Sequence, residues 1–262
     1  MGNIKINNLS FAYEEGSPLI LKDITTDIEA GEFVCILGQS GCGKSTLLRL
    51  IAGLEKPTIG NLTLNGEEIK GASLERGVVF QDYGLFPWMT AGENIMLALK
   101  QRFPGRDKNE LKKIATDMMK EVGLADDVFK KLPKELSGGM KQRCAIAQAF
   151  SIDPPILLMD EPFGALDAVT RAKLQDLVKE LWSKQEEKKT VFFVTHDVDE
   201  ALLLANRILV LGQRPSNIIF DCKLPDELKA TRETQFSNPE VMKLRNELIY
   251  QINKDVASHI TE

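Results

Sequence analysis

Four short segments of the chain are almost continuously hydrophobic, and each has the length of a single strand. They are EFVCIL, GVVF, PILLM and TVFFVT. Strands that are buried on both faces have this composition, and they occur mainly in parallel sheets covered by helices. Helical patterns lie between the four segments, so the sequence predicts an α/β fold with a largely parallel sheet.

Two further segments alternate polar and apolar residues. They are NIKINNLSFAY at 3–13 and GNLTLNG at 60–66. A period of two is typical of a strand with one face on the core and the other in solvent, as in antiparallel sheets. We therefore predict an antiparallel β subdomain in addition to the parallel sheet. NIIFDCKL predicts one more strand near the end of the chain.

The stretch between residues 82 and 155 contains no strand-like run. One helix in it is predicted by the spacing of four apolar residues, Leu111, Ile114, Met118 and Val122. Gly123 directly after this pattern would end the helix, because glycine adopts the left-handed conformation of a C-terminal cap. The sequence thus predicts a helical subdomain inserted into the α/β body.

Two later segments also have helical periodicity. The first has its apolar face at Leu174, Leu177, Val178, Leu181 and Trp182, which we interpret as core packing. The second starts at Pro239 and carries Val241, Leu244, Leu248, Ile252 and Val256 in register. An amphipathic helix of this kind either folds back on the body or meets a partner, and we favour folding back.

The segment GQSGCGKST, from Gly38 to Thr46, matches the phosphate-loop pattern G-x-x-x-x-G-K-[ST]. It follows the buried FVCIL run and precedes the helical STLLRLIAGL, which is the context that this motif requires. Its glycines allow the backbone to wrap around phosphates, Lys44 reaches the terminal phosphates and the Ser45 hydroxyl helps to hold Mg²⁺. The start of the following helix, near Thr46, completes an anion site.

Each hydrophobic run leads into polar residues of the type that nucleotide chemistry uses. FVCIL leads into the phosphate loop, GVVF into Gln81, ILLM into Asp160 and Glu161, and VFFVT into His196. In open parallel sheets, ligands bind beyond the carboxyl ends of the strands. The four strand ends are therefore predicted to form one site.

Each of these side chains suits one role in phosphoryl transfer. Asp160 would coordinate Mg²⁺ directly or through water. Glu161 would point away from Asp160, because neighbours on an extended chain face opposite ways, and would activate a water as general base. His196 would donate to the γ-phosphate and orient the water. Gln81 would bridge Mg²⁺ or the water with its amide.

Composition narrows the classes of function. The net charge is −5 and the pI about 5.4, which gives no global support for nucleic-acid binding. The four cysteines have no CxxC spacing, so neither a zinc site nor a disulfide framework is indicated. Cys42 is a reactive-thiol candidate, but we favour a small residue that the loop tolerates. No apolar run is long enough to span a membrane, and MGNIKINNLS lacks signal-peptide features, so any membrane role is expected to be peripheral.

A second glycine-containing segment, LSGGMKQR at 136–143, also opens a predicted helix. Together with GQSGCGKST, Gln81, ILLMDEP, GALD and His196, in this order, it makes the chain resemble the ATP-binding cassette (ABC) ATPases over nearly its whole length. That resemblance implies a P-loop NTPase core with an antiparallel β subdomain and an inserted helical subdomain. The implied boundaries are 1–81 and 156–225 for the core, 82–155 for the helical subdomain and 226–262 for a helical tail.

In this family, two cassettes pair head to tail, and the signature loop of one covers the ATP on the phosphate loop of the other. The resemblance implies that Ser137, Gly138 and Gly139 bind the γ-phosphate in trans and that Asp167 lies at the dimer seam. It also implies that Tyr13 stacks on adenine, with a buried core tyrosine as the alternative. The predicted ATP-binding residues are Tyr13, Gly38, Gln39, Ser40, Gly41, Cys42, Gly43, Lys44, Ser45, Thr46, Ser137, Gly138, Gly139 and Asp167. The predicted Mg²⁺ residues are Ser45, Gln81 and Asp160, and the predicted catalytic residues are Glu161, His196, Lys44 and Gln81.

The segments LSGGM, GALDAVTR and THDVDEALLLA look like those of the ATP-binding subunits of nitrate, sulfonate and taurine importers. The resemblance implies a second cassette, a homodimer in the complex, transmembrane permease subunits and, indirectly, an extracytoplasmic solute-binding protein. The protein would lie on the cytoplasmic face of the cell membrane. Phe86, Pro87 and Trp88 would receive a permease helix or, equally, form local core.

Three other classes of function are less well supported. Soluble ABC proteins of DNA repair or translation usually carry two cassettes or a long coiled-coil insertion, and neither is visible. A nucleotide-dependent scaffold without turnover does not need the set of Lys44, Asp160, Glu161 and His196. An exporter cassette from a fused chain is the third alternative.

Overall fold

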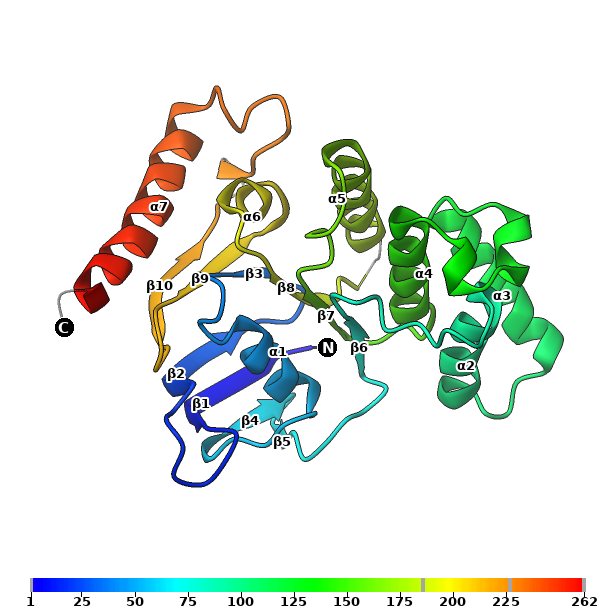
Figure 1. Ribbon diagram of the computed structural model, residues 1–262, viewed down its shortest axis with the longest axis horizontal. Coiled ribbons are helices and arrows are strands. Elements are labelled where there is room, and N and C mark those ends of the chain that lie inside the picture. The colour runs from blue at the N-terminus through cyan, green and yellow to red at the C-terminus, as the bar shows by residue number, and fades with distance from the viewer. Residues whose placement is uncertain (1, 185–186, 226–227, 261–262) are drawn as a thin grey trace. The chain divides into compact units, whose positions relative to one another are not determined.

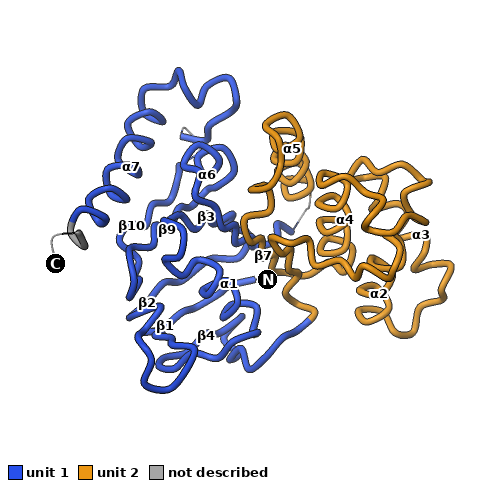
Figure 2. Tube along the Cα trace, viewed as in Figure 1, with its two compact units in different colours: residues 1–73, 187–262 blue, residues 74–186 orange. Residues whose placement is uncertain are grey.

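The structure is a computed structural model, and it describes residues 2–184, 187–225 and 228–260. The chain divides into two compact units (Figure 2). Unit 1 comprises residues 1–73 and 187–262, and unit 2 comprises residues 74–186. Each unit has its own set of strands and helices.

Unit 1 contains two groups of strands (Figure 1). One is an antiparallel sheet in the order β2-β1-β4-β5, and the other has the order β10-β9-β3-β8. The strands are β1 (Ile4–Phe11), β2 (Leu21–Ile28), β3 (Phe33–Leu37), β4 (Ile59–Leu64), β5 (Glu67–Glu68), β8 (Thr190–Val194), β9 (Arg207–Leu211) and β10 (Ile218–Lys223). The helices are α1 (Lys44–Ala52), α6 (Val198–Leu204) and α7 (Pro239–Ile260).

The buried strands of unit 1 confirm the prediction from the continuous hydrophobic runs. All residues of β3 and β8, which EFVCIL and TVFFVT predicted, are buried, and so are all residues of β9. β3 runs parallel to both β8 and β9, and β10 closes the group as an antiparallel neighbour of β9. The strand predicted over NIIFDCKL is therefore present.

The antiparallel sheet confirms the prediction from the alternating segments. β1 pairs with β4 and also with β2. β2 was not predicted from the sequence. The pairing of β1 and β2 shifts register between Leu9 and Phe11, and β2 buries Leu21 and Ile24 three residues apart. This irregularity breaks the period of two, so the alternation that marks a strand is not visible in LKDITTDI.

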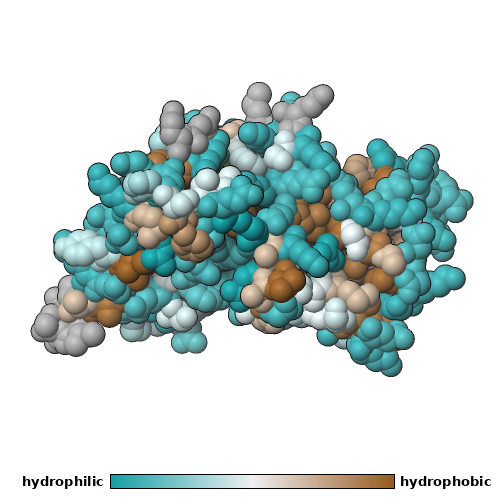
Figure 3. All heavy atoms as spheres, turned by 90° about the horizontal axis from the view of Figure 1, so that it is seen from above, coloured by the Kyte–Doolittle hydropathy of each residue, from teal (hydrophilic) through white to brown (hydrophobic). Residues whose placement is uncertain are grey.

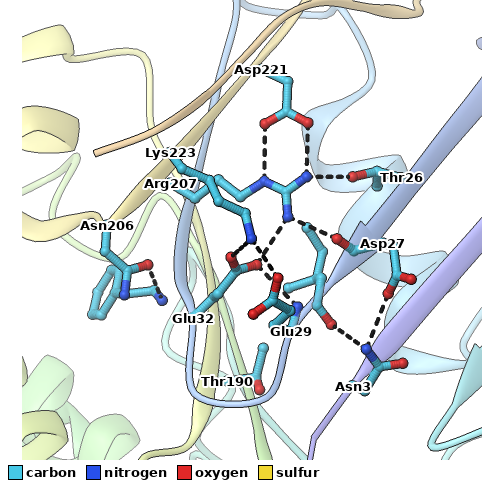
Figure 4. A network of polar contacts seen from close by, with 12 residues as sticks. Asn3, Thr26, Asp27, Glu29, Glu32, Thr190, Asn206, Arg207, Asp221 and Lys223 are labelled. Carbon is cyan, nitrogen blue, oxygen red and sulfur yellow. Dashed lines mark hydrogen bonds and ion pairs between the residues drawn. The ribbon is translucent and has the colours of Figure 1, made fainter. Parts of the chain in front are cut away.

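Arg207 joins the two groups of strands in unit 1 (Figure 4). Its guanidinium donates to the Asp27 carbonyl at 2.7 Å, to Thr26 Oγ1 at 3.1 Å and to both carboxylate oxygens of Asp221. It also pairs with Glu32 at 3.0 Å. These contacts, first among them the one to Asp221, raise the pKa of Arg207 above its ordinary value. Removal of one partner would leave a largely buried charge, which is strongly destabilising.

Unit 2 combines a parallel strand pair with helices. Its elements are β6 (Arg76–Val79), α2 (Ala91–Arg102), α3 (Lys108–Glu121), two 3₁₀ helices (Asp126–Lys130 and Pro133–Glu135), α4 (Gly138–Ser151), β7 (Ile156–Asp160) and α5 (Ala168–Ser183). α2 packs on α3 and α4, and β6 runs parallel to β7. No strand lies between residues 82 and 155, as predicted. The domain boundaries inferred from the resemblance stay a prediction.

α3 ends as predicted but turns a different face to the core. Gly123 has a φ of +75°, and the amide of Leu124 bonds back to the Met119 carbonyl, which caps the helix. The residues that the helix and its cap bury are Leu111, Ala115, Met119 and Val122. Ile114 and Met118 are half-buried, because a helix with apolar residues on adjacent rows can turn either row inward.

The C-terminal helix folds back on unit 1. α7 packs against α6, and Val241 and Leu248 are fully buried. Arg245 forms an ion pair with Asp199 of α6, with Nε to Oδ1 at 2.6 Å. In Figure 1, α7 accordingly runs beside α6. This agrees with the preferred interpretation of its amphipathic pattern.

Candidate functional site

The phosphate loop connects β3 to α1 in unit 1, as the sequence predicted. Gly41 and Gly43 have φ values of +83° and +110°, a region that residues with side chains rarely adopt. At Gly38 a side chain would collide, because a Cβ would lie 2.8 Å from the Leu211 carbonyl oxygen. The loop therefore requires glycine for conformation at two positions and for close approach at a third.

Lys44 lies inside the phosphate loop. The residue is 4% exposed, and its ammonium donates to the carbonyl oxygens of Gly38 at 2.9 Å and Gln39 at 3.0 Å. The N-cap residue of α1 is Gly43, which has no side chain to cap the helix, and no acidic residue occupies the first turn. A cation and a helix N-terminus are thus combined in one loop, which favours a bound anion.

Tyr13 lies at the edge of this loop. Its phenol oxygen is 3.2 Å from Thr46 Oγ1, and its ring meets Phe11 edge-on at 5.0 Å. The residue is 54% exposed, so the alternative of a buried core tyrosine is wrong. An exposed ring held next to the phosphate loop is available to stack on a base.

Cys42 is buried at 5% exposure, and burial raises the pKa of its thiol. A protonated thiol is a poor nucleophile, so the structure favours the interpretation of Cys42 as a packed small residue. Burial likewise raises the pKa of Cys144 to about 12.

β8 delivers His196 next to the phosphate loop in the topology of unit 1. β3 and β8 are parallel neighbours, with Ile36 opposite Val194, so both chains leave the same edge. Thr195 is buried and its hydroxyl accepts from the Asp197 amide at 3.0 Å, whereas His196 is exposed. The strand end therefore presents the imidazole to solvent at the edge where the loop begins.

β6 and β7 form the equivalent pair in unit 2. Val79 lies opposite Met159, so Gln81 and Asp160 follow adjacent strand ends. Gln81 is exposed, and Asp160 is half-buried at the last position of β7. Of the four strand ends named in the sequence, two are thus parallel neighbours in unit 1 and two are parallel neighbours in unit 2.

Glu161 departs from the expected extended conformation. Its φ is +42°, in the left-handed region, so the alternation of neighbouring side chains does not orient it. The turn continues through the Gly164 amide, which donates to the Glu161 carbonyl at 3.2 Å. A glutamate that keeps such a backbone conformation is typical of a functional position, because the strain must be held by its surroundings.

The signature loop opens α4 in unit 2. Ser137 is the N-cap and accepts from the Met140 amide at 3.3 Å. A Cβ on Gly138 would lie 3.2 Å from the Tyr83 hydroxyl, and one on Gly139 would lie 2.8 Å from Thr170 Cγ2. Glycine at 139 is therefore required by the close approach of α4 to the first turn of α5.

Asp167 lies in the same hollow as the signature loop, although 28 residues separate Asp167 from Gly139 in the numbering. The hollow has a volume of about 410 Å³ and is bordered by Ser137, Gly138, Gly139, Met140, Arg143, Ala165, Leu166, Asp167, Thr170 and Lys173. Asp167 caps the N-terminus of α5, so the N-terminus of α4 and the cationic side chains of Arg143 and Lys173 are the features that favour an anionic ligand here. The structure thereby brings together two of the predicted ATP-contacting segments.

Asp167 also caps α5. Its Oδ1 accepts from the amides of Val169 at 3.1 Å and Thr170 at 3.0 Å. The hydrogen bonds from Thr170, above all, hold the pKa of Asp167 below its usual value. The carboxylate is therefore ionised at neutral pH and fixed at the mouth of the hollow.

Sequence interpretation missed the other polar residues of this hollow, Arg143, Thr170 and Lys173. Thr170 stands three residues after Asp167, the spacing of an N-cap and its N3 position, so the sequence carried a signal for the capped turn. The contact of Thr170 with Gly139 depends on how α4 packs on α5, which no local pattern reveals.

Phe86 and Trp88 are exposed, at 39% and 73%, so the alternative that this cluster is local core is wrong. Their rings lie 5.4 Å apart. Trp88 borders a second hollow of about 580 Å³, whose other lining residues are Met89, Glu93, Met96, Leu97, Lys100, Pro104, Arg106, Lys108 and Leu111. This groove is largely apolar, with charged residues among its lining.

Surface and metal chemistry add three observations. No helix among the described residues is long and apolar enough to cross a membrane. The face in Figure 3 is largely hydrophilic, with hydrophobic residues in separate groups. Within the described ranges, no cluster of three His, Cys, Asp or Glu side chains is arranged to hold a metal ion by itself.

A phosphate loop between a buried parallel strand and a helix defines the class of P-loop nucleotide-binding proteins. The model of the ABC transporter family matches residues 21–164, which include the phosphate loop, the signature loop, Asp160 and Glu161. The chain belongs to the ABC transporter family. It is an ATP-binding ABC ATPase of α/β fold.

Similar proteins include two ATP-binding proteins of Synechococcus elongatus. The nitrate import ATP-binding protein NrtD is 41% identical over 92% of this chain and 87% of its own length. The bicarbonate transport ATP-binding protein CmpD is also 41% identical, with the same coverage. Among solved structures, the dimeric post-hydrolysis state of the ATP-binding cassette MJ0796 bound to ADP and Pi aligns with a TM-score of 0.76. Its sequence is 35% identical, and the match covers 85% of this chain and 99% of that one.

Proposed function

We propose that the chain is the ATP-hydrolysing subunit of an importer for a small anion, and that it works as one of two cassettes that close on ATP. The observation that carries the proposal is the open hollow where Ser137, Gly138, Gly139 and Asp167 lie together. One nucleotide requires one phosphate loop, so a second anion-directed helix N-terminus in the same chain suits the nucleotide of a second cassette. The dimeric form of the similar cassette MJ0796 supports this interpretation.

In the proposed pair, the phosphate loop of one chain and the signature loop of its partner enclose each ATP. Lys44 binds the terminal phosphates, Tyr13 stacks on adenine, and Glu161 activates the attacking water with His196 as the orienting group. Gly138 and Gly139 contact the γ-phosphate from the partner chain, and Asp167 lies at the seam. We infer a homodimer within the transport complex.

Mg²⁺ fits the donor groups that the chain supplies. Ser45, Gln81 and Asp160 offer one hydroxyl, one amide and one carboxylate, and all three are exposed or half-buried at strand or helix ends. Magnesium is usually held by one or two carboxylates together with substrate phosphates and water, so it needs no all-protein cluster. When bound, the ion would neutralise charge on the transferred phosphate.

The groove beside Trp88 is proposed as the docking site for a permease helix. One tryptophan, several aliphatic residues and four charged residues in the lining suit an amphipathic helix laid into a groove. The protein would then lie at the cytoplasmic face of the membrane, with an extracytoplasmic solute-binding protein as an indirect partner. Nitrate and bicarbonate in the names of similar proteins favour a small anion, and alkanesulfonates and the zwitterion taurine also carry an anionic group.

A tagged chain should therefore co-purify, in mild detergent, with a polytopic permease identified by mass spectrometry. Trp88→Ser should abolish this capture, because it removes the exposed aromatic side chain that lines the groove. Phe236→Ser, at another exposed aromatic, should leave it unchanged. Ribosomal or DNA-associated partners without a membrane protein would favour the soluble ABC ATPase instead and would contradict the importer.

A further inference from the structure

The connection between β9 and β10 lies against the phosphate loop within unit 1. Ser216 in this connection is fully buried, and its hydroxyl donates to the carbonyl oxygen of Cys42. The backbone of Ser216 is fixed in turn, because its amide donates to the Ile20 carbonyl at 2.9 Å and its carbonyl accepts from the Lys22 amide at 2.8 Å. Ser216, itself fixed by two backbone hydrogen bonds, thus bonds to the backbone of the phosphate loop at Cys42, one position before Gly43.

Gln213 of the same connection and Leu211, the last residue of β9, also reach the phosphate loop. Gln213 Nε2 donates to Gln39 Oε1 at 3.1 Å. The carbonyl oxygen of Leu211 lies so near Gly38 that a Cβ there would be 2.8 Å away. Residues 211–216 therefore contact the loop at its start, at its second residue and at Cys42.

The C-terminal helix holds this connection from the other side. Asp255 of α7 accepts the Gln213 amide proton at 2.7 Å between N and Oδ2. A Cβ on Gly212 would lie 2.8 Å from Asp255 Oδ1, so glycine at 212 allows the approach. Gln213 thus bonds to Asp255 through its backbone amide and to Gln39 through its side chain.

We propose that Ser216 and Gln213 are positioning residues for ATP and that Asp255 couples α7 to the phosphate loop through them. The phosphate loop has positive φ only at glycines, which are conformationally permissive, so contacts from neighbouring segments are needed to hold the loop in one conformation. Preorganised amide donors bind phosphate without the cost of ordering the loop at that moment. The state of α7 consequently sets the affinity for ATP, and ATP in turn stabilises the contacts of α7, since coupling between sites is reciprocal.

The proposal rests on the phosphate loop as the ATP site, and not on the transported solute or the partner chains. It is tested by the Kd of a fluorescent ATP analogue, measured well below the melting temperature of each variant. Gln213→Ala and Asp255→Ala should each raise Kd by roughly 3- to 10-fold, as expected for one lost neutral or charge-assisted hydrogen bond. Asp255→Asn retains a carbonyl oxygen that accepts the Gln213 amide, so it should bind ATP as the unmodified chain does.

Asn253→Ala is the matched control, because Asn253 is an exposed residue of the same helix. Hydrogen exchange of residues 249–257 supplies the reciprocal measurement, with slower exchange expected in the presence of ATP and a smaller effect in Gln213→Ala. A purely structural role would lower the melting temperature and leave Kd and the ATP-dependent exchange unchanged. ATP affinity equal to that of Asn253→Ala in either alanine variant would overturn the proposal, whereas failure of the unmodified chain to bind ATP would overturn the nucleotide site itself.

Discussion

The phosphate loop and the signature loop are both glycine-containing segments at the start of a helix, yet they are built differently. In the phosphate loop, Lys44 is buried and donates to two backbone carbonyls, and the N-cap Gly43 has no side chain. In the signature loop, Ser137 is exposed and caps the Met140 amide with its own hydroxyl. The loop borders an open hollow instead of enclosing a cation.

This difference separates two ways of binding an anion. A buried lysine and a tightly turned backbone hold phosphate within one chain, because the charge and the amides are fixed before the ligand arrives. The start of α4 is exposed at Ser137, which caps it, and lies beside Asp167. It suits contact with a ligand that another chain binds. The comparison therefore predicts that damage to the first loop weakens ATP binding, whereas damage to the second loop spares binding and lowers turnover.

The largest effect is expected for Glu161→Gln, which tests whether the two loops meet across two chains. Loss of the general base should reduce ATP turnover by about 10²- to 10⁴-fold while binding persists. Unhydrolysed ATP would then hold the two loops together, so light scattering should detect a dimer at saturating ATP. The exposed Glu121→Gln serves as the control. A strict monomer under these conditions would contradict closure between two cassettes.

Lys44→Ala should weaken ATP binding about 10- to 100-fold, since a charge-assisted contact to phosphate is lost. A fluorescent ATP analogue would report the affinity, and phosphate release would report the turnover. Lys22→Ala, at an exposed lysine of β2 in the same unit, should change neither quantity. If Lys44→Ala retained full affinity and turnover, the assignment of the phosphate loop would be wrong.

Gly139→Ala should produce a smaller effect with a different signature. The new Cβ would press on Thr170 Cγ2 and destabilise unit 2 by about 1–3 kcal/mol, measured by denaturant unfolding. Thr170→Ser removes that methyl group, so the double variant should regain stability. ATP affinity of the isolated chain should stay unchanged, and turnover should stay low even in the double variant, because the γ-phosphate contact needs the glycine backbone. Full recovery of turnover in the double variant would mean that Gly139 serves only packing and does not contact the γ-phosphate.

Local pattern was enough to predict much of the fold. Continuous apolar runs identified the buried strands β3, β6, β7 and β8, because residues in strands covered on both faces have little choice but to be hydrophobic. The phosphate loop was equally predictable, since the backbone conformation that requires its glycines is contained within nine consecutive residues. The sequence did not predict β2, because a bulge interrupts the alternation of polar and apolar residues. The predicted buried face of α3 was displaced by one row of side chains, because two adjacent rows of the helix are apolar.

The sequence by itself determined the class of chemistry, through residues whose roles are set by neighbours a few positions away. Tertiary structure alone decided which distant segments meet. The packing of α4 on α5 placed Gly139 against Thr170 beside Asp167, and the β9–β10 connection placed Ser216 and Gln213 on the phosphate loop. Such contacts join residues that can be more than 100 positions apart, as with Cys42 and Ser216. Local periodicity does not predict these contacts, because they depend on how whole helices and strands pack against one another.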